Sequence, residues 1–138
     1  MEYTIKGLDK LNKKLKGMSG PELKKELTDT TQKALFYVHG TVPPYPAPPV
    51  GSTYKRTGTL GRGINTQVKT IGGEIAGVIG SPTVYAPWVI SSKAVDEVGP
   101  QTSVHKRTGW YTLQSVVEKA RKTVVDFYDK MVKRLIRR

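Results

Sequence analysis

Residues 64–80 read INTQVKTIGGEIAGVIG, and their side chains follow a period of two. Ile64, Thr66 and Val68 alternate with more polar neighbours, which is the pattern of a half-buried β-strand. Gly72-Gly73 is a two-residue hairpin turn signal, and residues 74–80 can form the returning strand. The stretch therefore predicts a β-hairpin within an antiparallel sheet.

Strands are also expected on both sides of this hairpin in the sequence. Residues 84–90 read VYAPWVI after a Ser-Pro-Thr turn, and they predict a third strand that completes a meander. Pro87 cannot donate to a ladder, so this strand is expected at a sheet edge or with a bulge. Near the N-terminus, Tyr3 and Ile5 fall on one side of residues 2–6, which predicts a short strand there.

Helical spacing governs the rest of the chain. Leu8, Leu11 and Leu15 predict a short helix, and a second helix is expected to begin near Pro21 and to end at Gly40. Apolar residues recur at i+3, i+4 and i+7 from residue 113 to residue 135, which predicts a long C-terminal helix. The order of elements indicates an α+β fold: a small antiparallel sheet, made of the short N-terminal strand and the three-stranded meander, packed against helices.

The most unusual segment lies between the second helix and the hairpin. It contains five of the nine prolines, namely Pro43, Pro44, Pro46, Pro48 and Pro49. Proline fixes φ and lacks an amide donor, so the segment is expected to be extended, polyproline-like and outside the sheet interior. We expect a single domain over residues 1–138, with an extended arm at about 42–56 and an irregular loop at about 91–109. The alternative for the proline run is an ordered surface loop.

The composition limits the partners and the chemistry. With 23 Lys and Arg against 11 Asp and Glu, the net charge of +12 favours an anionic partner, either nucleic acid or an acidic protein surface. The absence of cysteine excludes disulfides and zinc–thiolate sites. No apolar run approaches the roughly 18 residues of a membrane span, and the first residues lack the apolar run of a signal peptide. We therefore expect no membrane partner and synthesis in a cytoplasm.

Signals of catalysis are weak. His39 and His105 are far apart, the acids are scattered, and the phosphate-binding and dinucleotide-binding glycine patterns are missing. The best enzymatic alternative is a basic ribonuclease, with His105 as general base and Arg56 or Arg107 holding the phosphate. We expect a protein that is not an enzyme, with no catalytic residues, no metal site and no cofactor.

A second alternative is a basic nucleic-acid-binding module. In it, Lys55, Arg56, Arg62, Lys106 and Arg107 could contact phosphates. Tyr54, Trp88 and Trp110 would be available for stacking on bases. The tetrapeptide Lys-Arg-Thr-Gly occurs at 55–58 and again at 106–109, with different flanks; coincidence and a shared turn geometry are both open.

Several segments, in order, resemble the minor structural proteins that complete the tail of long-tailed bacteriophages or join it to the head. Residues 5–11 match the family's strand running into G-L-x-x-L, and Arg56-Thr57-Gly58-Thr59-Leu60 matches its R-T-G-x-L turn. Tyr85-Ala86-Pro87-Trp88-Val89 matches Y-A-x-x-V, and residues 45–49 match a proline-rich Y-P-x-P-P found in a subset. Residues 108–113 resemble the G-R-W-x-T-L stretch before the last helix, with the arginine moved, and residues 90–93 depart from the common E-x-G.

The resemblance implies a non-enzymatic structural virion protein at the head–tail junction or the upper end of the tail, made in the bacterial host cytoplasm. Its expected partners are copies of itself in a homo-oligomeric ring, other neck, connector and tail proteins, and genomic DNA in the channel. The expected assembly residues are Pro43, Pro44, Tyr45, Pro46, Pro48, Pro49, Tyr54, Arg56, Thr57, Gly58, Leu60, Tyr85, Ala86 and Trp88. The residues expected to face DNA or an acidic partner are Lys55, Arg62, Lys106, Arg107, Lys133, Arg134, Arg137 and Arg138.

Overall fold

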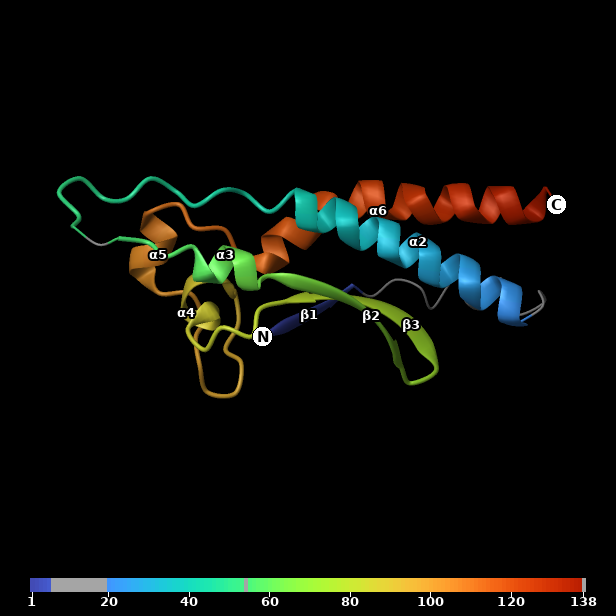
Figure 1. Cartoon of the computed structure of the whole chain (residues 1–138), viewed down its shortest axis with the longest axis horizontal. Coiled ribbons are helices and arrows are strands. Elements are labelled where there is room, and N and C mark those ends of the chain that lie inside the picture. The colour runs from blue at the N-terminus through green and yellow to red at the C-terminus, as the bar shows by residue number, and fades with distance from the viewer. Residues whose placement is uncertain (6–19, 54, 138) are drawn as a thin grey trace.

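The computed structural model describes residues 1–5, 20–53 and 55–137. Within them the protein mixes helix and sheet, and two long helices lie on one face of a small antiparallel sheet (Figure 1). The helix expected at Leu8, Leu11 and Leu15 lies outside the described residues, as do Tyr54 and Arg138.

The predicted hairpin is confirmed. Strand β2 (Asn65–Ile71) pairs antiparallel with β3 (Glu74–Gly80), and Ile71 faces Glu74 across the turn. Gly72 and Gly73 have φ values of 57° and 80°, which is the left-handed geometry of a type I′ hairpin turn. The predicted N-terminal strand is also present as β1 (Glu2–Ile5), and it pairs with the other side of β3. The sheet order is therefore β1-β3-β2.

The prediction of a third meander strand at residues 84–90 is wrong. This stretch contains the short helix α4 (Ala86–Ile90), and β1 occupies the free edge of β3 that the meander strand would have taken. Pro87 lies in the first turn of α4, where its missing amide costs no helical hydrogen bond. Ala86, Val89 and Ile90 are buried at helical spacing, but an apolar run this short has no period that distinguishes a helix from a strand.

Two further short helices occur where none was expected. Helix α3 (Thr59–Gly63) follows the Arg-Thr-Gly turn, in a stretch for which the sequence predicts no helix. Helix α5 (Ser103–Arg107) lies within the segment expected to be an irregular loop, and the side chain of Thr102 caps its first turn by accepting the amide of His105.

The two long helices match the prediction closely. They are α2 (Gly20–Gly40) and α6 (Leu113–Ile136), which begins with a capping box between Thr112 and Ser115. They run side by side in opposite directions (Figure 1). Thr31 of α2 meets Tyr128 of α6 with 2.6 Å between their hydroxyl oxygens.

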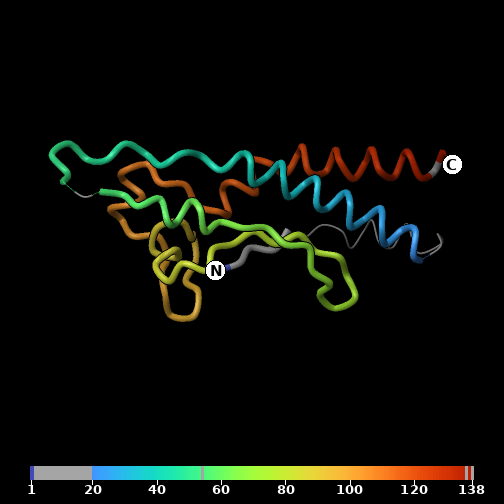
Figure 2. Tube along the Cα trace, viewed as in Figure 1, coloured from blue at the N-terminus to red at the C-terminus, as the bar shows by residue number. Residues whose placement is uncertain are grey.

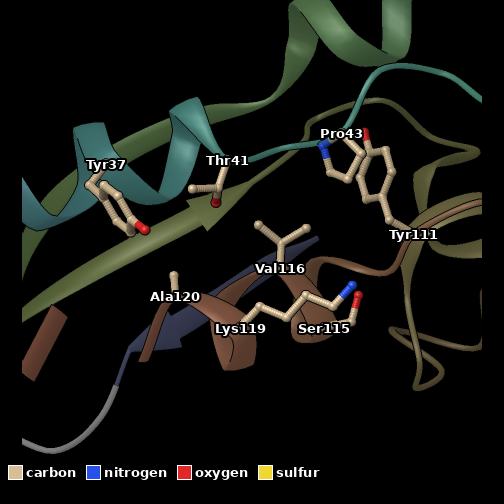
Figure 3. Close-up of a pocket in the computed structure, with 8 residues that line it drawn as sticks. All are labelled: Tyr37, Thr41, Pro43, Tyr111, Ser115, Val116, Lys119 and Ala120. Atoms are coloured by element: carbon tan, nitrogen blue, oxygen red, sulfur yellow. The ribbon is translucent and has the colours of Figure 1, made fainter. Parts of the chain in front are cut away.

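A shallow pocket of about 200 Å³ opens where the end of α2, the start of the proline-rich segment and the first turns of α6 meet (Figure 3). Tyr37, Pro43 and Tyr111 line it together with the side chain of Lys119. Its surface is mostly apolar, and its polar lining residues are Lys119 and the hydroxyl-bearing Tyr37, Thr41, Tyr111 and Ser115.

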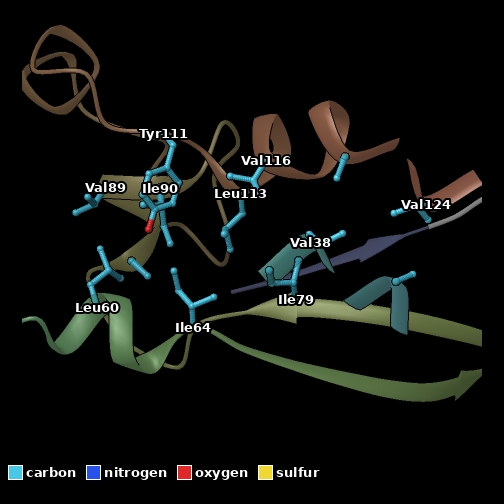
Figure 4. Close-up of a cluster of buried hydrophobic side chains, with 13 residues drawn as sticks. Val38, Leu60, Ile64, Ile79, Val89, Ile90, Tyr111, Leu113, Val116 and Val124 are labelled. Atoms are coloured by element: carbon cyan, nitrogen blue, oxygen red, sulfur yellow. The ribbon is translucent and has the colours of Figure 1, made fainter. Parts of the chain in front are cut away.

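The main core joins the helices to the sheet and to the short helices (Figure 4). Its buried members are Ala34, Val38, Leu60, Ile64, Ile79, Ala86, Val89, Ile90, Tyr111, Leu113, Val116, Ala120 and Val124. The glycine at position 77 of β3 lets α2 approach closely, because a Cβ there would lie 3.1 Å from atoms of Leu35 and Thr31. A second cluster of Leu27, Ile75 and Met131 continues the packing toward the C-terminal end of α6.

Residues 42–49 belong to no helix or strand. The segment leaves the end of α2, runs away from the long helices and returns to α3 (Figure 2). Most of its side chains are exposed, while Tyr45 and Pro46 are partly buried. This contrast divides the segment into an anchored base and an exposed tip.

Candidate assembly interface

The base of the proline-rich segment is held by a cluster of two aromatic rings and one guanidinium. The rings of Tyr45 and Trp110 lie 4.9 Å apart between centroids. The guanidinium carbon of Arg56 lies 5.2 Å from the Trp110 centroid and 5.8 Å from that of Tyr45. Such contacts contribute about 0.5–1 kcal/mol each when exposed and more when desolvated. The cluster therefore ties the segment to the residues that precede α6.

Hydrogen bonds add to this attachment. The Arg56 guanidinium donates to the backbone carbonyl of Pro46, and the Tyr45 hydroxyl accepts the amide of Gly61 in α3. Gly61 has little room for a side chain, because a Cβ there would lie 3.1 Å from that hydroxyl oxygen. Tyr45 thus connects the proline-rich segment to the turn that follows it.

Both Lys-Arg-Thr-Gly tetrapeptides come close to Pro46. The first provides Arg56, and the second ends at Gly109, where an added Cβ would lie 3.9 Å from the Pro46 side chain. Gly58 and Gly109 share left-handed backbone angles, with φ of 74° and 86°. Gly58 precedes helix α3, however, whereas Gly109 follows helix α5, so the tetrapeptides share a glycine conformation but occupy opposite ends of their helices.

The tip of the segment presents apolar side chains to solvent. Pro48, Pro49 and Val50 are all exposed, and Val50 has no protection from its neighbours. Pro43 and Pro44 are also exposed. The expected assembly prolines therefore lie on the surface, except for Pro46, which is partly buried and whose carbonyl accepts a hydrogen bond from Arg56.

A second apolar surface lies at the start of α4. Tyr85 and Trp88 keep 44% and 41% of their surface accessible, and Val84 keeps 81%. Ala86, between them, is fully buried, as is Leu60 in α3. The expected assembly residues of the Tyr85–Val89 motif and the Arg56–Leu60 motif therefore differ in exposure. Tyr85 and Trp88 reach solvent, whereas Leu60 and Ala86 belong to the buried core. Thr57 is exposed and bonds through its hydroxyl to Thr59, while Gly58 adopts the turn that precedes α3.

The expected cationic residues divide into exposed and paired groups. Those whose side chains are exposed are Lys55, Arg62, Lys106, Arg107, Lys133 and Arg137. Arg134 is half exposed and also forms an ion pair with Glu26 of α2, whose side chain is only 16% accessible. Arg134 therefore links the two long helices, and Arg56 is committed to the aromatic cluster.

The enzymatic alternative gains no geometry from the structure. The Nδ1 atom of His105 lies 2.7 Å from the Thr102 hydroxyl, and its ring packs edge-on against Trp110 at 5.9 Å. Arg56 also lies near Trp110, where its guanidinium is committed to the ring and to the Pro46 carbonyl. In the ranges that the structure describes, no group of three His, Asp or Glu side chains could hold a metal ion.

Tyr111 is the unusual titratable group of this region. It is 9% exposed, and its hydroxyl has no hydrogen-bond partner among the described residues. Burial raises its pKa to about 12, and the neighbouring Tyr45 phenol adds to the rise. The hydroxyl belongs to the core around α4 (Figure 4) and is a packing element with an unsatisfied polar atom.

Three surface features escaped the sequence analysis: the tip residue Val50, the exposed Val84, and the acidic pair Asp96-Glu97. The last two lie in segments predicted as a strand and an irregular loop, so their exposure had no local signal.

No helix in the described part of the chain is long and apolar enough to cross a membrane. Comparisons with protein-family models, with curated proteins and with solved structures gave no match.

Proposed function

We propose that this protein is a non-enzymatic structural component of a tailed phage virion. In this role it forms a homo-oligomeric ring at the head–tail junction or at the upper end of the tail. The proline-rich segment would act there as an extended arm that neighbouring subunits or adjoining rings complete. Connector, neck and tail proteins are the expected neighbours.

One observation carries the proposal: three segments that bear the resemblance pack against one another. Tyr45 of the proline-rich segment, Arg56 of the Arg-Thr-Gly turn and Trp110 before the last helix form one cluster. These side chains hold a loop whose tip is exposed and apolar, which suits a subunit that must reach a neighbour.

Two other features support an assembly role. The sheet has the order β1-β3-β2, so β1 and β2 are its outer strands and β2 presents an unpaired edge among the described residues. Exposed strand edges are a common route by which further chains pair with a sheet. The aromatic residues at the start of α4 supply a separate apolar contact surface.

The proposed function can be tested by deleting the gene for this protein from the phage genome. We expect filled heads and tails that fail to join, or tails of abnormal upper structure, when lysates are viewed by electron microscopy. Complementation with the intact gene should restore complete particles. Normal infectious particles without the protein would overturn the proposal.

The basic nucleic-acid-binding module remains the second candidate, because of the cationic outer surface of α6. Lys119, Lys122 and Lys133 are exposed there, and Arg137 follows the helix. A free binding module should bind DNA as a monomer, with affinity falling steeply as salt rises. A ring subunit should bind weakly until assembly multiplies its contacts. Replacing Lys133 and Arg137 with Gln should weaken either kind of DNA contact without affecting the Arg134–Glu26 pair.

A further inference from the structure

The surface at α4 has the composition of a site for a proline-rich peptide. Tyr85 and Trp88 expose aromatic rings, and Val84 beside them is almost fully accessible. Proline-rich segments in the polyproline conformation bind to such exposed aromatic side chains, because their shape is fixed before binding and little entropy is lost. The fold covers these rings only partly, so they are available to a partner.

The chain itself carries a proline-rich segment, in which Pro48 and Pro49 lead into a turn closed by the hydrogen bond from the Ser52 amide to the Pro49 carbonyl. Pro48 and Pro49 are exposed, and Val50 projects fully into solvent. The base of the segment is restrained, because Arg56 holds the Pro46 carbonyl and Tyr45 packs on Trp110. A tip on a restrained base has fewer conformations to lose on binding, which lowers the cost of association.

Charge also matches between the two surfaces. Asp96 and Glu97 form the exposed turn between the bridged residues Val95 and Val98. The loop that carries this turn packs on α4, where the amide of Thr102 donates to the Trp88 carbonyl. In a chain of net charge +12, Asp96 and Glu97 are an acidic spot on the same loop that contacts α4. The proline-rich tip is followed by the exposed Lys55, so an apolar tip is followed by a cation.

We propose that Pro48, Pro49 and Val50 of one copy dock on Tyr85 and Trp88 of a second copy, with Lys55 facing Asp96 and Glu97. The proposal rests on the function above in taking the partner to be a second copy of this chain. Each copy offers both a tip and a receiving surface, so the contact is head-to-tail and can close into a ring. A single contact of this size is small, and it gains strength when all contacts of the ring form together.

The absence of cysteine allows a direct test by site-specific cross-linking in the full chain. One variant carries Val50→Cys, and a second, distinguished by an affinity tag, carries Val84→Cys. After mixing and mild oxidation, a disulfide-linked heterodimer is expected in yields well above those of a control pair. The control replaces Val84→Cys with Ile71→Cys, since Ile71 is also exposed but lies at the hairpin turn.

A second arm of the experiment tests the chemistry of the contact. Trp88→Ser in the Val84→Cys chain should reduce the cross-linking yield several-fold, while Trp88→Phe should retain most of it. Asp96→Lys combined with Glu97→Lys should also reduce it, and Lys55→Glu in the Val50→Cys chain should restore part of the loss. Circular dichroism of each variant shows that a lower yield does not come from unfolding.

The outcomes separate this inference from the proposed function. Equal yields for the Val84 and Ile71 pairs, or insensitivity to Trp88→Ser, would overturn the docking of the tip. If native mass spectrometry still showed rings in that case, the ring function would stand and only this contact would fail. If Trp88→Ser removed both the rings and the Val50–Val84 cross-link, the result would support the docking contact and the ring function together.

Discussion

The guanidinium of Arg56 lies 5.2 Å from the centroid of the Trp110 ring and also donates a hydrogen bond to the carbonyl of Pro46. One side chain therefore joins the proline-rich segment to the residue that precedes Tyr111 and helix α6. Arg56 is partly buried and contributes both packing and a hydrogen bond. Its loss should therefore lower the stability of the fold and also free the proline-rich segment.

Arg56→Ala should lower the free energy of unfolding by about 1–3 kcal/mol, as expected for a lost charge-assisted hydrogen bond and a lost ring contact. The proline-rich segment should also become more sensitive to limited proteolysis. Lys55→Ala is the matched control, because Lys55 is exposed and adjacent. Urea titration and proteolysis measure both effects. Equal stability of the two variants would show that the Arg56 contacts contribute little.

Gly77→Ala should destabilise the protein by about 1–3 kcal/mol through overpacking. The added Cβ would lie 3.1 Å from atoms of Leu35 and Thr31, which are themselves buried between α2 and β3. Gly40→Ala is the control, since no atom lies within 4 Å of the corresponding Cβ. Thermal unfolding should show a lower midpoint for the first variant only, and an unchanged midpoint would mean that α2 can shift away from the sheet without cost.

Val124→Asp should prevent folding, because it buries a carboxylate without a partner between α6 and the sheet, at a cost of several kcal/mol. Val125→Asp adds the same charge one residue later, where half of the side chain is exposed, and it should fold normally. Far-ultraviolet circular dichroism of the two variants compares them directly. Folding of both would contradict the assignment of the buried face of α6.

Stability should fall at high pH because of Tyr111. Its pKa is raised from 10.0 to about 12 in the folded protein, so folding favours the neutral phenol. The contribution is fully present below pH 10 and is lost as the pH rises through about 12, at roughly 1.4 kcal/mol per unit of pKa difference. Tyr111→Phe should remove this part of the pH dependence.

At neutral pH, Tyr111→Phe should leave stability unchanged or slightly higher, because the Tyr111 hydroxyl has no hydrogen-bond partner among the described residues. Tyr128→Phe is the comparison: burial raises its pKa as well, but its hydroxyl meets that of Thr31 at 2.6 Å. That variant should lose about 0.5–1.5 kcal/mol at neutral pH. A larger loss of stability for Tyr111→Phe than for Tyr128→Phe would contradict the conclusion that the Tyr128 hydroxyl is hydrogen-bonded and the Tyr111 hydroxyl is not.

Local signals explain why parts of the fold could be predicted from the sequence. The Gly72-Gly73 turn and the alternation beside it define β2 and β3, and long apolar periods define α2 and α6. Helix α4 could not be recognised, because seven apolar residues around Pro87 suit a strand as well as a helix. The pairing of β1 with β3 depends on contacts between distant residues, which no local pattern records.

The candidate site was only partly predictable for a related reason. Exposed prolines and basic residues follow from composition, so Pro48, Pro49 and Lys106 lie on the surface as expected. The roles of Arg56 and Arg134 were not visible, because each depends on a partner far away in the chain: Trp110 for the first and Glu26 for the second. Sequence indicates which residues carry charge, and only the fold determines which charges are already engaged.

The position of Pro46 near both Lys-Arg-Thr-Gly turns has a consequence for local unfolding. Its carbonyl is held by Arg56, and a Cβ added at Gly109 would lie 3.9 Å from its side chain, so both turns lie close to the same residue. The proline-rich base, the turn before α3 and the turn after α5 should then open as one cooperative unit, separate from the sheet. The amides of Gly61, Gly109 and Trp110 are all hydrogen-bonded within this unit. Native-state hydrogen exchange should therefore give these three amides the same free energy of opening.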